Sequence, residues 1–227
     1  MEFMAECKDG QFDLAIPDPP YGINWDKEKE SMSAGIRKDG SRRKYNKWND
    51  PKPKKYKKGN YDDSIPDKKY FDLLFECSNR QIIWGGNYYT KYLEPIGGWV
   101  IWDKKVVMPT LSKVELAWTS FLGHTEIFRY LWAGYRKEKP ENRIHVNQKP
   151  VALYKWLLKN YAQPGWTIFD SHVGSGSLRI ACHDMGYDFV GCELDPDYWQ
   201  AQEDRFKRHI KQPELWGKEE IQAAIYE

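Results

Sequence analysis

Short apolar runs alternate with longer amphipathic stretches along this chain, a pattern typical of strands separated by helices. The first run, Phe12 to Pro17, has the length of one buried strand. Further strands are predicted at Arg80–Trp84, Gly98–Trp102, Val114–Thr119, Thr167–Asp170 and Asp188–Glu193. Helices are predicted at Asp67–Asn79, Val151–Tyr161, Leu178–Met185 and Pro196–Lys211. This order predicts an α/β fold with a mostly parallel sheet in a three-layer arrangement.

Length and composition limit the class of protein. The 227 residues have room for one large α/β domain, 1–227, with an insertion. No apolar run is long enough for a transmembrane helix, and the acidic N-terminus lacks the basic region of a secretory signal. The four cysteines show no CxxC spacing, which argues against a zinc site and against a disulfide framework. We therefore expect a cytosolic protein with free thiols.

The tetrapeptide Asp18-Pro19-Pro20-Tyr21 directly follows the first predicted strand. It places a carboxylate, rigid carbonyls and an aromatic ring at the carboxyl edge of the sheet, where open α/β sheets bind ligands. Asp18 and the Pro19 carbonyl could accept both hydrogens of a nucleobase amino group, since the prolines limit competing donors. Tyr21 could stack on a base flipped out of a duplex. The alternative is a simple Asp-Pro turn beside an aromatic residue.

A basic insertion is predicted at residues 24–62. Between Lys27 and Lys58 there are 13 basic and 4 acidic residues, an excess of +9 in a chain of net charge +2. Aromatic residues interleave with the charges, and glycines and prolines disfavour regular structure. Such a loop is suited to phosphate contacts, and a solvated insertion without a partner is the alternative. The candidate nucleic-acid contacts are Arg37, Arg42, Arg43, Lys44, Trp48, Lys54 and Lys55.

A second candidate site follows the predicted strand Thr167–Asp170. The strand leads into the turn Gly174-Ser175-Gly176 and then a helix, and glycines allow the backbone to approach a ligand closely. The next predicted strand ends at Glu193, whose carboxylate could accept the ribose hydroxyls of a nucleoside-containing cofactor. The full GxGxxG pattern is absent, so S-adenosylmethionine fits better than a dinucleotide. An ordinary tight turn is the alternative.

In combination, these motifs resemble the amino-DNA methyltransferases. The matching residues are Asp18-Pro19-Pro20-Tyr21, Asn147-Gln148-Lys149-Pro150, Phe169-Asp170 with Gly174-Ser175-Gly176, and Glu193-Leu194-Asp195. Their order resembles the β-type arrangement of that family. The resemblance covers Phe12 to about Arg208, apart from the basic loop and the stretch near 120–145.

The resemblance implies a Rossmann-like fold and methyl transfer from S-adenosylmethionine to a flipped-out adenine N6 at specific sites of double-stranded DNA. Cytosine N4 is the alternative target, and adenine is preferred because the family links Asp at the first motif position more to adenine and Ser more to cytosine. The same motifs would also fit a catalytically inactive DNA-binding relative or an RNA methyltransferase. Cytosine C5 methylation is rejected, since its nucleophilic Pro-Cys dipeptide is absent.

The resemblance also implies roles by position. Asp18, Pro19, Pro20 and Tyr21 would hold the target base. The cofactor would be bound by Asp170, Ser171, His172, Gly174, Ser175, Gly176, Glu193, Asn147, Lys149 and Pro150. Lys149 would contact the carboxylate of the cofactor, or would be an exposed lysine at a helix start.

Two departures from the family bear on these roles. Ser171-His172 replaces the usual Pro-Phe, so His172 would supply only part of the usual aromatic contact, or would serve in packing. A strand that the family often has before Phe12 is missing or shortened, as in a truncated start, and a contact to the cofactor's adenine would be lost with it.

Sequence specificity is expected from a small target-recognition region at 121–146. Arg129 and Arg136 are its candidate nucleic-acid contacts. Further candidate readers are Tyr130, Trp132, Tyr135 and Lys137, with phosphate contact or core packing as the alternative for each. Because the region is small, we expect help from the basic loop or from a second subunit in a homodimer. The resemblance implies a cytoplasmic protein of a bacterial or phage-infected cell, with or without a cognate restriction enzyme.

Overall fold

The structure, a computed structural model, describes residues 1–23, 63–95, 98–106, 112–133, 136–139, 141–145 and 147–211, without the side chains at 133 and 136. The chain forms two compact units, Met1–Pro19 with Asp67–Glu227, and Pro20–Pro66. In the second unit, Gly22 adopts a φ of +70° beside Ile65. The predicted basic contacts from Arg37 to Lys55 lie outside the described residues, as does Tyr135.

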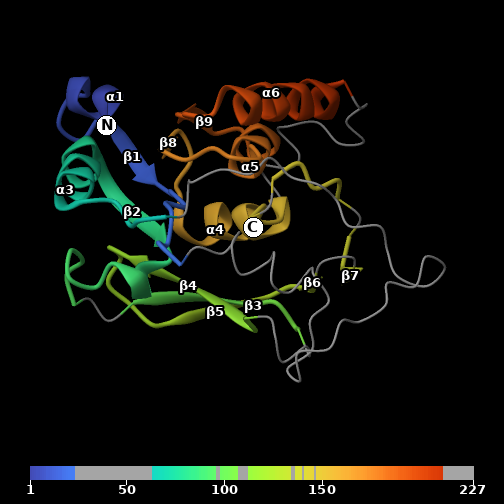
Figure 1. The fold of residues 1–227 in the computed structure, drawn as a ribbon, viewed down its shortest axis with the longest axis horizontal. Helices are drawn as coiled ribbons and strands as arrows, with labels where there is room; N and C mark the ends of the chain where they lie inside the picture. The colour runs from blue at the N-terminus through green and yellow to red at the C-terminus, as the bar shows by residue number, and fades with distance from the viewer. Residues whose placement is uncertain are drawn as a thin grey trace. The chain divides into compact units, whose positions relative to one another are not determined.

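A seven-stranded sheet organises the first unit (Figure 1). Its strands are β1 (Phe12–Ala15), β2 (Ser78–Trp84), β3 (Trp99–Asp103), β4 (Val114–Thr119), β5 (Glu126–Arg129), β8 (Thr167–Asp170) and β9 (Asp188–Gly191). The order across the sheet is β5-β3-β4-β2-β1-β8-β9. Within this sheet β4 runs antiparallel to β2 and β3, and the other neighbouring pairs are parallel. The predicted α/β fold with a mostly parallel sheet is confirmed.

Helices cover both faces of the sheet. They are α1 (Glu2–Glu6), α3 (Lys68–Cys77), α4 (Val151–Tyr161), α5 (Ser177–Met185) and α6 (Pro196–Ile210), with a short 3-10 helix η1 (Gly86–Tyr88) after β2. In Figure 1, α1 and α3 lie on one side of β1 and β2, and α4 and α5 lie on the other. Strands β6 (Trp132–Ala133) and β7 (Arg136–Lys137) form a separate antiparallel pair. The sequence pattern did not predict α1, β5, β6 or β7, because each is too short to show a period.

Local sequence explains where the helices begin. The Asp67 carboxylate caps α3 by accepting the Tyr70 N–H at 3.0 Å. The Asp195 carboxylate caps α6 by accepting the Asp197 N–H at 2.9 Å, and a proline occupies the first turn. Helix α5 begins after Gly176, whose φ of +71° lies in the left-handed region that favours glycine. Helix α5 follows β8, and α6 follows β9. The first turns of α5 and α6 therefore lie close to the carboxyl edge of the sheet.

The main core lies between the sheet and the helix pair α4 and α5. Leu153, Leu157 and Leu158 of α4 are fully buried and pack with strand residues such as Ile82 and Val100. Removal of such apolar surface from water stabilises the fold by about 25 cal/mol per Å². This packing holds α4 against the sheet, and it thereby also holds the residues directly before α4 near the sheet.

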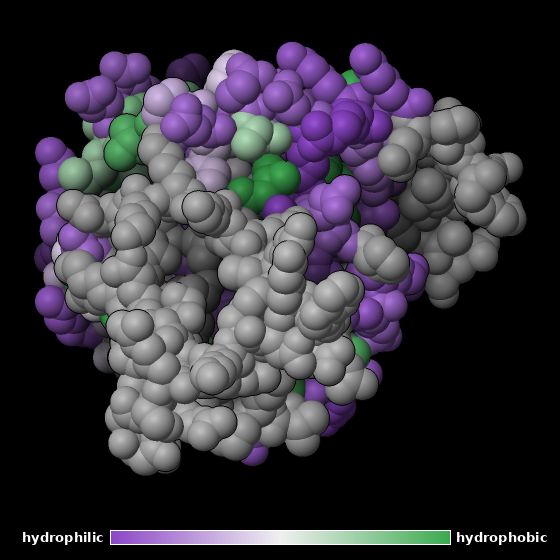
Figure 2. All heavy atoms as spheres, turned by 45° about the vertical axis from the view of Figure 1, so that its right-hand side comes forward, coloured by the Kyte–Doolittle hydropathy of each residue, from purple (hydrophilic) through white to green (hydrophobic). Residues whose placement is uncertain are grey.

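The face of the described part that Figure 2 draws is mostly polar. Figure 2 shows mostly hydrophilic side chains among its coloured residues, including those along the top of the view, where α6 lies in Figure 1. Across the described ranges, no helix combines the length and the apolar character needed to cross a bilayer.

Leu157→Ala should lower the free energy of unfolding by about 2–5 kcal/mol, because Leu157 is fully buried in the α4 core and its truncation leaves a cavity. Denaturant titration would measure this loss. Lys159→Ala, at an exposed position on the same helix, is the matched control and should change stability by less than about 0.5 kcal/mol. Equal effects of the two changes would contradict this account of the core.

Candidate active site

Acidic side chains from several strands gather at one edge of the sheet. Asp18 follows β1, and Asp170 and Glu193 lie at or just after the ends of the parallel strands β8 and β9. Glu115 is near the start of β4, and it reaches the same edge because β4 is antiparallel to its neighbours. Glu115 was not predicted from the sequence, since in a parallel strand it would lie at the opposite edge. Carboxylates this close together repel one another unless a nearby cation or a bound proton offsets their charge.

Nearby positive charge is supplied by an ionic cluster of half-buried side chains around the buried Lys149. Only 3% of the Lys149 side chain is exposed; its ammonium group contacts Asp18 Oδ2 and lies 3.1 Å from Glu115 Oε2. The ammonium group of Lys104 contacts the other carboxylate oxygen of Glu115. Lys149 Nζ also lies 5.1 Å from the centre of the Trp84 ring, within the range of a cation–π contact. Within the described ranges, Lys149 is thus paired with the carboxylates of Asp18 and Glu115.

The pKa values in this cluster reflect mutual stabilisation of its charges. Burial by itself would lower the pKa of Lys149, but the carboxylates of Asp18 and Glu115 raise it above its usual value. Burial by itself would raise the pKa of Glu115, but the ammonium groups of Lys149 and Lys104 lower it to about 2. Glu115 and Lys149 are therefore both charged at neutral pH.

The Pro19 carbonyl, the second predicted acceptor, is also held in place. The hydroxyl of Tyr89, which is fully buried, donates a hydrogen bond to this carbonyl at 2.8 Å. A carbonyl oxygen has two lone pairs, so the same oxygen can accept a further N–H. Pro20 and Tyr21 belong to the second compact unit, where both are half-buried.

The turn after β8 is tied to Glu193. The backbone N–H of Gly174 donates to Glu193 Oε2 at 2.8 Å, and the N–H of Asp195 donates to Oε1 at 2.9 Å. Gly176 has a φ of +71°, which favours glycine, and an added Cβ would also lie 3.1 Å from the side-chain oxygen of Gln202. The predicted turn residues and Glu193 therefore form one hydrogen-bonded unit at the edge of the sheet.

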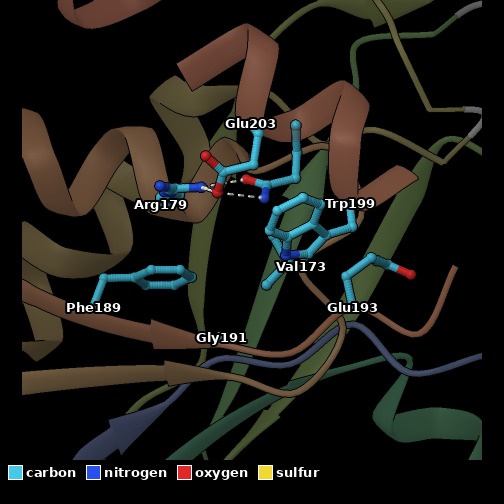
Figure 3. Close-up of a pocket in the computed structure, with 8 residues that line it drawn as sticks. Val173, Arg179, Phe189, Gly191, Glu193, Trp199 and Glu203 are labelled. Atoms are coloured by element: carbon cyan, nitrogen blue, oxygen red, sulfur yellow. Dashed lines mark hydrogen bonds and ion pairs between the residues drawn. The ribbon is translucent and has the colours of Figure 1, made fainter. Parts of the chain in front are cut away.

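A cavity of about 230 Å³ opens beside Glu193, between β9, the turn and α6 (Figure 3). Apolar groups of Val173 and Phe189 and the indole of Trp199 line it, and the Glu193 carboxylate supplies a polar acceptor. The remaining lining residues are Arg179, Gly191, Gln202 and Glu203. Aromatic side chains next to a carboxylate suit a nucleoside, with the base against Phe189 or Trp199 and the ribose on the acid. Trp199 was not predicted from the sequence, because it does not belong to any recognised motif.

Asp170 lies beneath the turn, with 3% of its surface exposed. Its carboxyl group accepts the His172 N–H at 2.9 Å. Burial, reinforced by the charges of Asp18 and Glu193, raises the pKa of Asp170 to about 8, although the His172 N–H and Lys149 oppose the shift. A cationic ligand placed beside Asp170 would favour its ionised form.

Ser171 and His172 form a hydrogen-bonded series with Tyr70 of α3. Ser171 Oγ lies 2.8 Å from the Tyr70 hydroxyl and 2.9 Å from His172 Nδ1. The Tyr70 ring packs edge-on against the imidazole with centroids 5.5 Å apart. Burial lowers the pKa of His172 to about 4, so its ring is neutral at pH 7. The hydrogen bond and the ring contact therefore hold the His172 imidazole in one orientation, as expected for a side chain that serves in packing.

The segment that carries Lys149 is anchored on both sides. The side-chain oxygen of the buried Gln148 accepts the Ile144 N–H at 2.9 Å. Arg205 of α6 donates to Glu141 at 3.1 Å and to the Ser175 carbonyl at 2.7 Å. The stretch before α4 is therefore connected to the turn after β8. Within this stretch Asn147 is exposed, and Pro150 is the buried residue that precedes α4.

Residues 121–146 include both exposed and buried candidates for DNA contact. Arg129 is accessible, with 61% of its side chain exposed. Tyr130 and Trp132, in contrast, are buried in the core, and the Trp132 indole donates to the Gln148 carbonyl at 3.0 Å. Burial excludes them as readers of a DNA groove, so the packing alternative applies to both. Arg136 lies in β7.

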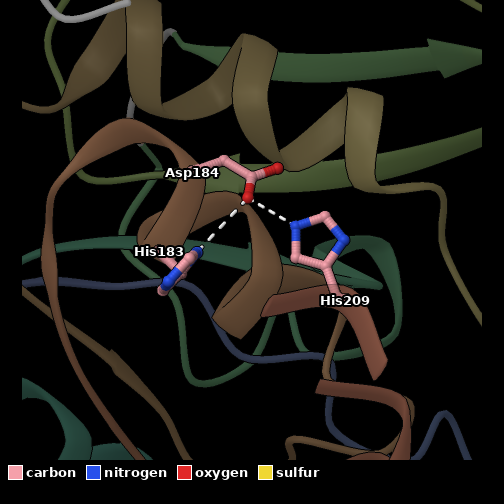
Figure 4. Close-up of side chains that lie close together, drawn as sticks. All are labelled: His183, Asp184 and His209. Carbon is pink, nitrogen blue, oxygen red and sulfur yellow. Dashed lines mark hydrogen bonds and ion pairs between the residues drawn. The ribbon is translucent and has the colours of Figure 1, made fainter. Parts of the chain in front are cut away.

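His183, Asp184 and His209 form a group whose side-chain atoms could hold a metal ion (Figure 4). Asp184 Oδ1 lies 2.5 Å from His209 Nε2 and 3.4 Å from His183 Nδ1. However, Asp184 Oδ2 lies 2.7 Å from the ammonium group of Lys155, which already balances the carboxylate charge. The group is therefore a polar contact between α4, α5 and α6, and we assign no metal to it.

Comparison with known proteins identifies the family. The profile of N6_N4_Mtase, described as DNA methylase, matches residues 38–204, which is most of the chain. The chain belongs to this DNA methylase family. The matched span begins after Asp18–Tyr21, so the tetrapeptide assignment rests on the residues themselves. The predicted resemblance to amino-DNA methyltransferases is confirmed.

The curated relatives of this chain include type II methyltransferases. It is 26% identical over 120 residues to the type II methyltransferase M.Cfr9I of Citrobacter freundii, covering 44% of this chain and 40% of the relative. The matches to curated relatives span only 28–43% of their lengths.

Two solved structures share the fold. TTHA0409, described as a DNA modification methylase of Thermus thermophilus and complexed with S-adenosylmethionine, has a TM-score of 0.54, 16% identity and 93% coverage of each chain. The cytosine-N4-specific PvuII DNA methyltransferase has a TM-score of 0.56 and 11% identity, covering 99% of this chain and 88% of its own.

The Asp170 pKa predicts a pH dependence of stability. Because this pKa is about 8 in the folded state and about 3.9 in unfolded chains, the folded state retains a proton that the unfolded state releases between these values. The contribution of Asp170 to the free energy of unfolding should fall as pH rises from about 4 to about 8, by at most ~1.4 kcal/mol per pH unit.

Asp170→Asn should remove this contribution, since an amide stays neutral and can still accept the His172 N–H. Urea midpoints measured from pH 5 to pH 8 would compare the two proteins. The variant should lose less stability than the wild type over this range. Parallel curves for the two proteins would contradict the raised pKa.

Proposed function

We propose that this chain transfers a methyl group from S-adenosylmethionine to an exocyclic amino group in double-stranded DNA, with adenine N6 as the target. The observation that carries this proposal is the placement of Asp18, the Pro19 carbonyl and the Glu193 cavity at one edge of the sheet. Open α/β sheets bind ligands at this edge. Membership of the DNA methylase family supports the same conclusion.

The residues at the edge fit the proposed cofactor. Each oxygen of Glu193 accepts one backbone N–H, and a carboxylate oxygen can accept a further hydrogen bond from a ribose hydroxyl. The adenine would lie against Phe189 and Trp199, and the methionine ammonium group would lie near Asp170. S-adenosylmethionine, when bound, supplies a methyl group that is already activated by the sulfonium. A related fold, TTHA0409, was solved in complex with this cofactor.

The protein's contribution would be to orient and polarise the target amine. The amino nitrogen of adenine is a poor nucleophile, because its lone pair is delocalised into the ring. Acceptance of its two N–H groups by Asp18 and the Pro19 carbonyl would favour a more tetrahedral nitrogen with an available lone pair. Orientation and preorganised polar groups are the main sources of rate enhancement in such a reaction. Tyr21 is predicted to stack on the flipped base.

Cytosine N4 is the second candidate target. Its amino group poses the same chemical problem, and the cytosine-N4-specific PvuII enzyme shares the fold over 99% of this chain. Asp18, where cytosine enzymes more often have Ser, is the reason for placing adenine first. DNA contacts by the basic insertion, Arg129 and Arg136 stay predictions, as do a homodimer and a cognate restriction enzyme.

Transfer of labelled methyl from S-adenosylmethionine to unmethylated genomic DNA would test the proposal, with nucleoside analysis of the product. We expect N6-methyladenine, and Asp18→Ala should reduce the rate by about 100-fold or more because it removes one acceptor of the amino group. The variant should still bind the cofactor, since Asp18 lies outside the Glu193 cavity.

Each remaining outcome of this assay has a distinct meaning. A product of 4-methylcytosine would establish the second candidate. Cofactor binding without transfer to DNA would favour an RNA substrate. Absence of both binding and transfer would favour a catalytically inactive relative.

Glu193→Gln should raise the Kd for S-adenosylmethionine by about 10-fold or more, because hydrogen bonds to a charged acceptor are worth about 1.5–3 kcal/mol. The amide preserves the size of the side chain and one acceptor for the turn. Isothermal titration calorimetry would measure binding, with Glu126→Gln, at an exposed position of β5, as the matched control. Unchanged affinity in Glu193→Gln would exclude Glu193 from the cofactor site.

A further inference from the structure

Four charged side chains make a continuous series of contacts at the carboxyl edge, in the order Lys104, Glu115, Lys149 and Asp18. They come from the ends of β3 and β1, the start of β4 and the segment before α4. The exposed fractions of the side chains are 17%, 22%, 3% and 19% in the same order. The most buried member, Lys149, thus joins the two acids.

Stability alone does not explain this series. A buried ion pair usually adds little net stability, because removing the charges from water offsets their attraction. An apolar side chain of similar length at position 149 would fill the space beside Trp84 without that cost. The arrangement is therefore better explained by what the ammonium group does to its neighbours.

The neighbours of Asp18 make its orientation dependent on Lys149. Asp170 at the end of β8, Tyr154 of α4 and Tyr70 of α3 all lie within electrostatic reach of Asp18. Burial raises the pKa of all three groups, so at neutral pH they are uncharged, and the charged contact of the Asp18 carboxylate among these groups is the one that Lys149 makes at Oδ2. This contact also limits rotation of the carboxylate about its Cβ–Cγ bond.

Lys149 is itself restrained by contacts other than Asp18. Glu115 holds the ammonium group at 3.1 Å, Trp84 lies beneath it, and Glu115 is in turn held by Lys104. A cofactor carboxylate would have to compete with these partners for the same ammonium group. These contacts favour an interaction of Lys149 with Asp18 over an interaction of Lys149 with the cofactor.

We propose that Lys149, anchored by Glu115, is a positioning residue that orients the Asp18 carboxylate toward the target amino group. This inference rests on the proposed methyl transfer. It assigns a role to Glu115 and replaces the expected contact between Lys149 and the carboxylate of the cofactor.

Lys149→Met tests the inference through separate measurements of kcat, KM for DNA and Kd for S-adenosylmethionine. We expect kcat to fall by about 10- to 100-fold, because misplacement of a reacting group by about 1 Å has an effect of this size. The KM and the Kd should stay within about 3-fold of wild type. A kcat equal to wild type, or a Kd for the cofactor raised 10-fold or more, would overturn the inference.

Glu115→Gln provides a second test should Lys149→Met fail to fold, because it keeps the shape of the side chain and leaves Lys149 paired with Asp18. It should lower kcat by a smaller factor with unchanged cofactor affinity, and an unchanged kcat would overturn the role of Glu115 as the anchor. Lys159→Met, at an exposed position on α4, is the control and should match wild type. Inactivity of the wild-type protein itself would instead overturn the proposed function, and the inference with it.

Discussion

The balance of charge at the carboxyl edge of the sheet is the constraint on which the site depends. Asp18, Glu115, Asp170 and Glu193 converge there because strand ends meet at one edge. Like charges this close would oppose folding unless cations or protons offset them. The structure uses both means, since Lys149 joins two of the acids and the raised pKa of Asp170 keeps its carboxyl group protonated at neutral pH.

The same edge joins segments that are far apart in the chain. Glu193 accepts a hydrogen bond from the turn after β8, and Arg205 of α6 connects that turn to Glu141, in the stretch that leads to α4. Binding in the Glu193 cavity would therefore contact the elements that also position Lys149. Because these contacts are made by buried or half-buried polar groups, loss of one partner leaves another unsatisfied. The proposed cofactor site around Glu193 and the proposed amino-group site around Asp18 are therefore connected by hydrogen bonds and ion pairs.

Most of the sheet and three of its acidic groups could be predicted from residue order. Asp18, Asp170 and Glu193 each end a short apolar run, and such an ending places a side chain at the carboxyl edge in a parallel sheet. Glu115 could not be found in this way, because its position depends on the direction of β4. Tyr130 and Trp132 were candidates for DNA contact, and their burial excludes them. The sequence could not show this, because an aromatic residue in a polar segment can pack into the core or face the solvent.

The sequence by itself determined the α/β class, the positions of the long helices and strands, and the family, since periodicity and short motifs are local properties of the chain. Only the tertiary structure decided which groups meet. Strand β4 runs antiparallel to its neighbours, and Glu115 therefore lies next to Lys149. Lys149 is also paired with Asp18, which lies 131 positions earlier in the chain. The tertiary structure also brought Trp199, Phe189 and Glu193 into the lining of one cavity. Strand direction and the packing of α6 depend on long-range contacts, which no local pattern of residues encodes.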